Sequence, residues 1–388
     1  MSSDEIIRNI VKRQRGFDEA TLKKIAARLN SIRGLGLVDL FDLGYFALMY
    51  SEMMKIDAMA DMARKRNVQD LSTLLNESAK SAYNGMKTLY LDGQREFLPY
   101  KSNQEVKDFV NTTSTSLCKD FNDKLGKIGY QMTDANGKRI FNSPSETYQH
   151  IVNTAKNQKT VNAFGYDLWA RNTMKKLLRN GLKIYNYNQD THRYKQQNCY
   201  SYIRNFVKNA VYQVCQGVYN TVANQVGIDG VEISVHADCA IDHLDVQGHQ
   251  FTLMDFHKMQ SGEDFYDVLG NHYYSLERAI GTWNCRHFVY PIILGKSEPR
   301  YTNEQLQKIK ENKNMIYAKV TNSLGETDYV PFSEFNLYKR ELQNRIDSLT
   351  VDMNVAEKLK DKWLEEYYKT RLSKCKLELA SIKRINIG

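Results

Sequence analysis

The longest amphipathic stripe in the chain runs from Ile203 to Val226 and ends at Gly227. Its apolar residues recur every third or fourth position over roughly six helical turns, which is the period of a helix and not of a strand. Glycine just past the last apolar residue is a frequent helix stop. The sequence therefore predicts one long, well-packed helix. Its apolar positions are Ile203, Phe206, Val207, Ala210, Val211, Val214, Val218, Val222 and Val226.

Proline is scarce, with five residues in a chain of 388. Because proline removes a helical hydrogen bond and clashes with the preceding turn, its scarcity permits long helices elsewhere. Residues 4 to about 90 are predicted to be helical, with Asp18 as an N-cap before an apolar face that includes Leu22 and Leu29. A further helix is predicted through Leu168 and Met174, ending at Gly181.

Length and composition indicate a globular protein with two or three domains, because 388 residues exceed what one small core can hold. Hydrophobic residues make up 42%, which is too many for a disordered chain. No apolar run approaches the roughly 20 residues that span a bilayer, and the N-terminus does not resemble a secretory signal, so no membrane partner is expected. The six dispersed cysteines indicate a reducing compartment rather than a disulfide framework.

The charge is unevenly distributed. Residues 151–230 carry 11 Lys and Arg against 3 Asp and Glu, whereas residues 231–300 carry 5 against 10. A basic block of this kind either contacts nucleic acid or an acidic protein, or forms a solvated helix face. If it contacts DNA, the candidate residues are Lys175, Lys176, Arg179, Arg204 and Lys208.

The pattern changes after the long helix. "VEISVH" (231–236) alternates apolar and polar residues, which predicts a half-buried strand, and "HQFTL" (249–253) predicts a second one. "YYSLERAIG" (273–281) is predicted to be a short helix, and "FVYPIIL" (288–294) a third apolar strand or loop. These segments indicate a small α+β domain.

The predicted fold class is mainly α with this small α+β domain near 231–295. Five regions follow along the chain: an N-terminal helical region (1–90), a mixed connecting region (91–150), a basic helical region (151–230), the α+β domain (231–300) and charged C-terminal helices (301–388).

Two clusters of cysteine and histidine fall inside the α+β domain. Zinc takes such ligands, usually in two close pairs. Cys239 and His243 would form one pair, and Cys285 and His287 the other, although one intervening residue is tighter than the usual spacing. A zinc site is therefore one hypothesis.

Three other interpretations stay open at this point. Cys285 with His236 or His243 would suit a thiolate–imidazole nucleophile, as in a Cys/His toxin-like enzyme. The carboxylates "DCAIDHLD" around His243 would suit a metal-dependent nuclease. Alternatively, these polar groups form a structural hydrogen-bonding network that braces a domain with little apolar core, which is the interpretation that the residues favour.

Several segments together resemble the tailed-phage minor capsid proteins of type 2, which are similar in their later half to Mu-type head-morphogenesis proteins. The resemblance covers nearly the whole chain. Its segments are "YLDGQREFLPYKSNQEVKDFV" (90–110), "LLRNGLKIYNYNQDTHRYKQQNCYSYIRNFV" (177–207), "VEISVHADCAIDHLDVQG" (231–248), "GTWNCRHFVYPIILG" (281–295) and the charged helices of the last 60 residues.

The residues that match this family frame by position are His236, His243, Gln247, Gly248, Gly281, Asn284, Cys285, Arg286, His287 and Pro291. The chain departs from the frame at residues 238–241, where the family has Gly-Ala-Arg-Pro, and at Val246, where it has Trp. Cys239 is thus not a family feature, which weakens a metal site that depends on it.

The resemblance implies a virion structural protein that is assembled in the host cytoplasm and present in few copies in the head, near the portal. It implies portal protein or major capsid protein as partners, and a role in head assembly, DNA packaging or ejection. Packaged double-stranded DNA would face the basic block. The resemblance implies neither an enzyme activity nor a cofactor.

Overall fold

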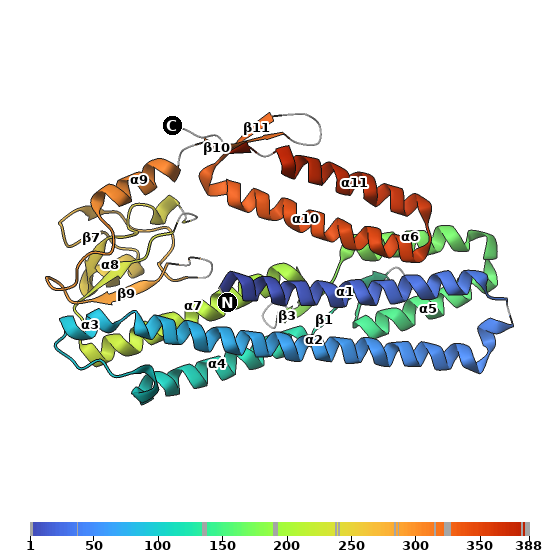
Figure 1. Ribbon diagram of the computed structural model, residues 1–388, viewed down its shortest axis with the longest axis horizontal. Helices are drawn as coiled ribbons and strands as arrows, with labels where there is room; N and C mark the ends of the chain where they lie inside the picture. Colours follow the sequence, from blue (N-terminus) through green and yellow to red (C-terminus); the bar gives the residue numbers. More distant parts are fainter. Residues whose placement is uncertain are drawn as a thin grey trace. The chain divides into compact units, whose positions relative to one another are not determined.

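The computed structural model describes residues 3–36, 38–133, 138–188, 193–236, 239, 241–282, 285, 287–313, 316–321, 327–381 and 383–384 (Figure 1). The chain divides into two compact units, each assembled from separated segments. The first unit comprises residues 1–70, 119–204 and 341–380, and the second comprises 71–118, 205–340 and 381–388. Each unit therefore contains parts of several of the five regions expected along the sequence.

The first unit combines helices with a four-stranded antiparallel sheet of order β2-β1-β3-β4. Its helices are α1 (Ser3–Gly34), α5 (Pro144–Val161), α6 (Tyr166–Asn180) and α11 (Lys362–Ser381), with 3₁₀ turns η1 (Asp39–Phe41) and η3 (Ala163–Gly165). Its strands are β1 (Ile128–Thr133), β2 (Arg139–Asn142), β3 (Lys183–Asn188) and β4 (Arg193–Asn198). The division between the units falls within α2 (Leu43–Asn84), α4 (Gln104–Leu125), α7 (Cys199–Val226) and α10 (Phe332–Leu359).

The second unit contains the small α+β domain. Its helical elements are α3 (Lys87–Asp92), η2 (Tyr100–Ser102), η4 (Ile241–His243), α8 (Leu253–Ser261) and α9 (Asn303–Lys313). Its strands are β5 (Gly230–Ile233), β6 (Gln250–Thr252), β7 (Phe265–Tyr266), β8 (His272–Tyr273), β9 (Val289–Ile292), β10 (Ile316–Thr321), β11 (Thr327–Pro331) and β12 (Lys383–Arg384).

The two helices predicted in the basic block are confirmed. α7 covers the predicted stripe, and Gly227 follows it at φ +79°. α6 ends before Gly181, which has φ +60° and donates its N–H to the carbonyl of Leu177. The predicted apolar face of α6 is wrong at one position, because Leu168 is 60% exposed. The buried face of this helix contains Ala170, Met174, Leu177 and Leu178.

The predicted N-cap at Asp18 is wrong. α1 is continuous from Ser3 to Gly34, so Asp18 lies in mid-helix and is buried. Its carboxylate accepts hydrogen bonds from the hydroxyls of Tyr130 and Tyr200. A short polar side chain that is frequent at helix starts is tolerated here because two partners from elsewhere in the first unit satisfy it.

The core of the α+β domain forms around β5, the central strand of the antiparallel sheet β6-β5-β9. Its buried apolar residues are Val231, Ile233, Val246, Phe251, Met259, Phe265, Ile280 and Cys285. Pro291 on β9 pairs with Val231 on β5. Because β9 is an edge strand, the missing N–H of proline costs the sheet no internal hydrogen bond.

The strand predicted at 231–236 is present as β5, but it is not half-buried, because all four residues of β5 are buried. Glu232 is fully buried between two neighbouring strands. Its carboxylate accepts hydrogen bonds from the Gln250 amide at 3.0 Å and from the backbone N–H of Arg300 at 3.1 Å. The Arg300 guanidinium lies 3.6 Å away. These partners offset the cost of burying a polar group that the alternating pattern placed in solvent.

The short helix expected at 273–281 is also wrong. That segment begins with the end of β8 and continues as bends and turns, while an unpredicted helix, α8, occupies 253–261. Thr252 caps α8 through its hydroxyl, which accepts from the Asp255 N–H at 3.0 Å. The predicted strand "HQFTL" (249–253) ends at Thr252, because this residue caps α8 instead of continuing the strand.

The predicted fold class, mainly α with a small α+β part, is confirmed. The C-terminal region is less uniformly helical than expected, since β10 and β11 form an antiparallel hairpin and β12 pairs with β10. The predicted final helix is interrupted at Lys360, which has φ +57°. No helix within the described residues is long and apolar enough to cross a membrane.

Candidate functional site

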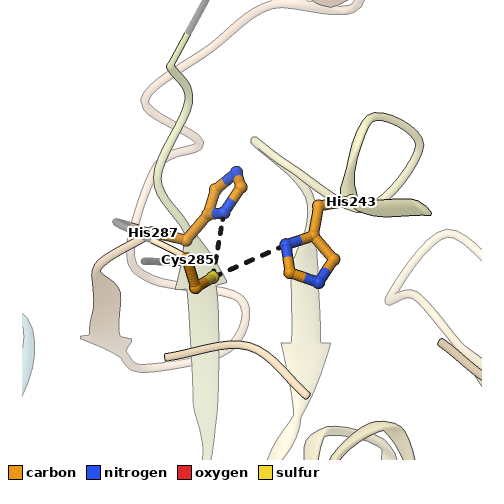
Figure 2. Close-up of side chains that lie close together, drawn as sticks. All are labelled: His243, Cys285 and His287. Atoms are coloured by element: carbon orange, nitrogen blue, oxygen red, sulfur yellow. Dashed lines mark hydrogen bonds between the residues drawn. The ribbon is translucent and has the colours of Figure 1, made fainter. Parts of the chain in front are cut away.

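Three buried side chains from separate parts of the sequence converge beside the β6-β5-β9 sheet. His243 ends the short η4 turn, and Cys285 and His287 stand just before β9. The Cys285 Sγ lies 3.5 Å from the Nδ1 of His243 and 3.3 Å from the Nδ1 of His287. Figure 2 shows the sulfur between the two imidazole rings, each presenting Nδ1 to it. We call these three residues the His–Cys–His cluster.

A polar frame holds the two rings of the cluster. The His243 Nε2 lies 2.8 Å from the carbonyl oxygen of Arg278. The His287 Nε2 lies 3.3 Å from the Gln247 Oε1, which also accepts the backbone N–H of His236 at 3.1 Å. The His236 ring lies beside that of His287 in a tilted arrangement, with 4.2 Å between centroids. The frame therefore fixes the orientation of both rings, as the structural interpretation of these residues requires.

Hydrogen bonds within the cluster outweigh the effect of burial on the pKa values of Cys285 and His243. Burial, the largest effect, raises the pKa of the Cys285 thiol. Hydrogen bonds from His243 and from the backbone N–H groups of Gly281 and His287 outweigh it, so the pKa falls below its ordinary value. Burial likewise lowers the pKa of His243, but hydrogen bonds to Cys285 and Arg278 outweigh it and raise that pKa. Each of the two groups thus stabilises the charged form of the other.

The cluster has the donor atoms for metal binding and those of a cysteine nucleophile. Cys285 is only 4% exposed, and His243 and His287 are fully buried. A nucleophile has to reach the substrate carbon, which this sulfur does not do from its buried position. The geometry therefore suits internal bonding or metal binding better than attack on an external substrate.

The other residues proposed for metal chemistry lie apart from the cluster. Cys239 is buried but does not join the group of three ligand atoms. Of the nuclease carboxylates, Asp245 pairs with Lys310 at 2.9 Å. Asp242 lies 3.5 Å from the His243 Nε2. Among the described residues these carboxylates form no common ligand group, and Asp238 lies outside those residues.

The remaining residues of the family frame have backbone roles where the structure describes them. Gly248 and Gly281 both adopt the left-handed conformation, with φ +78° and +83°. A Cβ at Gly281 would lie 2.6 Å from the Tyr212 hydroxyl, so a side chain at this position would have to displace the end of the tyrosine. Asn284 and Arg286 lie outside the described residues.

A second polar cluster, which no sequence motif indicates, surrounds Asp267. Asp267 accepts hydrogen bonds from the Tyr273 hydroxyl at 3.0 Å and from the backbone and side chain of Asn271, and its carboxylate lies 3.1 Å from the His249 Nδ1. Burial raises the pKa of Asp267, but these bonds outweigh it and lower that pKa. His249 was visible as part of a histidine-rich stretch, whereas nothing in the sequence paired it with Asp267.

The candidate DNA-binding residues are distributed over α6 and α7. Lys176 and Arg179 are exposed. Lys175 lies over the rings of Trp363 and Tyr367, with its Nζ 5.0 and 4.6 Å from their centroids. The guanidinium of Arg204 donates to Asn344 at 2.6 Å. Lys208 follows one turn later on α7 and is half-buried. Among these five, only Lys176 and Arg179 are exposed.

The comparison with known families agrees with the resemblance seen in the motifs. The family model described as phage minor capsid protein 2 matches residues 52–347, most of the chain. No curated protein matches the chain, and no solved structure does. The matched range includes the His–Cys–His cluster and its frame. The chain therefore belongs to the phage minor capsid protein 2 family.

Proposed function

We propose that the protein occupies the phage head at or near the portal, in few copies, and assists head assembly and DNA packaging or ejection. The observation that carries this proposal is the family match over residues 52–347, since a minor capsid protein is a structural component of the virion. Portal protein or major capsid protein is the partner expected of such a component, and assembly takes place in the host cytoplasm.

The role is structural and not enzymatic. The buried Cys285 sulfur does not fit a nucleophile, and among the described residues the carboxylates near His243 form no common metal-ligand group. The rival interpretation, a nuclease or a Cys/His toxin-like enzyme at 231–295, has one observation in its favour, the contact between Cys285 and His243. The same contact is also expected of a hydrogen-bonded frame that stabilises the domain.

Locating the chain in virions tests the proposal. Purified particles are digested, and the ratio of this chain to portal and to major capsid protein is measured by quantitative mass spectrometry. Detergent-disrupted heads are then immunoprecipitated through an affinity tag on this chain. The expected result is a ratio far below that of the major capsid protein, with portal recovered in the precipitate. Absence from virions would exclude the capsid role, and recovery of shell protein without portal would exclude the portal position.

Contact with packaged DNA is part of the proposal. The supporting observation is the balance of charge in residues 151–230, together with the exposure of Lys176 and Arg179 within one turn of α6. Side chains on one helix face with this spacing can reach neighbouring phosphates. Such contacts release condensed counterions, so their contribution is sensitive to salt.

Replacing Lys176 and Arg179 with Gln is expected to weaken binding to random-sequence duplex DNA. Each lost phosphate contact changes the slope of log affinity against log salt by about 0.9, so the double variant should differ from the native chain by about 1.8. Fluorescence anisotropy over a salt series measures this slope.

The matched control replaces Lys119 and Lys127 with Gln. These are exposed lysines outside the basic block but within the same unit. The control removes the same formal charge and should keep the native slope. Equal slopes for all three proteins would remove α6 from the DNA contact, and no binding at low salt would remove the DNA role.

A further inference from the structure

The His–Cys–His cluster presents three metal-ligand atoms, one from each residue, within 4.8 Å of one another. All three residues are buried, and the two rings flank the sulfur (Figure 2). Cysteine sulfur and imidazole nitrogen are the ligand types that zinc takes in proteins. Whether the cluster is a metal site or an internal hydrogen-bonded triad depends on where its protons are.

The protons on the two rings are fixed by their outer partners. The Arg278 carbonyl only accepts hydrogen bonds, so the His243 Nε2 that faces it at 2.8 Å carries a hydrogen. The Gln247 atom that faces His287 accepts the backbone N–H of His236, so that atom is the amide oxygen. The His287 Nε2 beside it therefore also carries a hydrogen. Each neutral ring then directs the lone pair of its Nδ1 toward the sulfur.

The thiol of Cys285 has one hydrogen, which is too few to donate to both Nδ1 lone pairs. A thiol carries one hydrogen, and its transfer to either ring leaves the number unchanged. At most one of the two Nδ1···Sγ contacts is thus a hydrogen bond when the cluster is neutral. In the other contact, two electron-rich atoms face one another inside the protein, away from water. A cation between the three atoms would turn both contacts into favourable ones.

We propose that His243, Cys285 and His287 bind one zinc ion through Nδ1, Sγ and Nδ1. With Zn–S of about 2.3 Å and Zn–N of about 2.0–2.1 Å at a tetrahedral angle, sulfur and nitrogen should lie about 3.6 Å apart. The two distances are 3.5 and 3.3 Å, so small side-chain rotations suffice to admit the ion. On binding, the thiol proton leaves to solvent and the sulfur becomes a thiolate.

The two histidines of the cluster have the second hydrogen-bond partners that are common around metal sites. Histidine ligands commonly donate their second N–H to a carbonyl or carboxylate, which sets the tautomer that binds. Arg278 has this role for His243, and Gln247 has it for His287. Zinc bound here would join the turn at 241–243 to the segment that leads into β9. Three protein ligands leave the fourth position of a tetrahedral ion to water or another donor.

The test measures zinc binding to the full chain. Protein freed of metal by a chelator is titrated with zinc against a chromophoric competitor, and bound metal is counted by mass spectrometry. One zinc per chain is expected, together with a higher melting temperature that the chelator reverses. Cobalt in place of zinc should give the strong visible bands of a tetrahedral site and a thiolate charge-transfer band. Because the native chain carries these readouts, they do not depend on whether any variant folds.

Variants then assign the ligands. Cys285→Ala and His243→Ala are expected to lose at least 100-fold in zinc affinity, and Cys285→Ala should also lose the thiolate band. Cys215→Ala is the matched control, since it removes a buried thiol from the same unit outside the cluster. It and Cys239→Ala should bind zinc as the native chain does. The proposal fails if the native chain binds no stoichiometric zinc, if Cys285→Ala keeps native affinity, or if Cys239→Ala loses the ion.

Discussion

Gly248→Ala is expected to cost about 2–5 kcal/mol of unfolding free energy in the second unit. Gly248 has φ +78°, a conformation that costs a residue with a Cβ about 1–2 kcal/mol. The added Cβ would overlap the Leu306 side chain and lie 3.0 Å from the Val235 Cγ2. Forcing an extra carbon into a packed site typically costs a further 1–3 kcal/mol or so. Urea denaturation of native and variant chains measures the difference.

Gly262→Ala separates the two contributions. Gly262 has the same φ of +78°, but a Cβ there would meet nothing within 4 Å. This variant carries the conformational cost alone and should lose only about 1–2 kcal/mol. Equal losses for the two variants would show that packing against Leu306 is unimportant. A loss below about 1 kcal/mol for Gly248→Ala would contradict the left-handed conformation itself.

Periodicity predicted the long helices because their burial repeats every three or four residues along one face. The stripe of α7 and the glycine stops after α6 and α7 were recognisable in this way, and they appear where predicted. The same reasoning fails where burial depends on partners that are distant in sequence. Alternation placed Glu232 in solvent, but neighbouring strands and the Arg300 backbone enclose it. Asp18 was assigned to a helix start, and tyrosines from β1 and α7 make it a buried residue instead.

The candidate site was predictable as a set of residues but not as a geometry. Cysteine and histidine in two short segments suggested a four-residue zinc site, and the structure brings three of the four together. The fourth predicted ligand, Cys239, is close to His243 in sequence. Closeness in sequence does not determine the direction of the Cys239 side chain. The outer partners were harder to foresee. The Arg278 carbonyl is a backbone group, which no side-chain pattern reveals, and Gln247 was identified only through the family frame.

A buried and a half-buried carboxyl group in the first unit, those of Asp18 and Asp352, make its stability depend on pH. Asp352 on α10 has its pKa raised to about 8, first by burial and then by the nearby charge of Asp18, with Arg371 opposing both. Burial also raises the pKa of Asp18, although hydrogen bonds from Tyr130 and Tyr200 lower it. Both carboxyl groups border a cavity of about 230 Å³. The basic side chains that line this cavity are Arg15, Arg179, Lys183 and Arg204.

Asp352→Asn is expected to stabilise the protein above pH ~8 and to change its pH dependence. In the native chain, Asp352 holds its proton up to a pH of about 8, whereas the unfolded chain releases it near 3.8. Between these values the folded state thus binds more protons than the unfolded state. The contribution of Asp352 to the free energy of unfolding is therefore fully present below about pH 4 and is lost as pH rises to about 8. Asparagine stays neutral throughout and avoids this loss. The variant should gain up to about 1.4 kcal/mol over the native chain for each pH unit in that window.

Chemical denaturation of both chains at intervals from about pH 5 to 9 measures this gain. Asp57→Asn is the matched control, since it makes the same substitution at an exposed position on α2 in the same unit. Its difference from the native chain should stay constant over the series, whereas that of Asp352→Asn should widen and then level off above pH ~8. A constant difference for Asp352→Asn would show that this carboxyl is ionised in the folded protein at neutral pH. It would then need a cationic partner in the cavity, and neutralising the nearby Arg371 should destabilise the fold by more than removing Asp352 does.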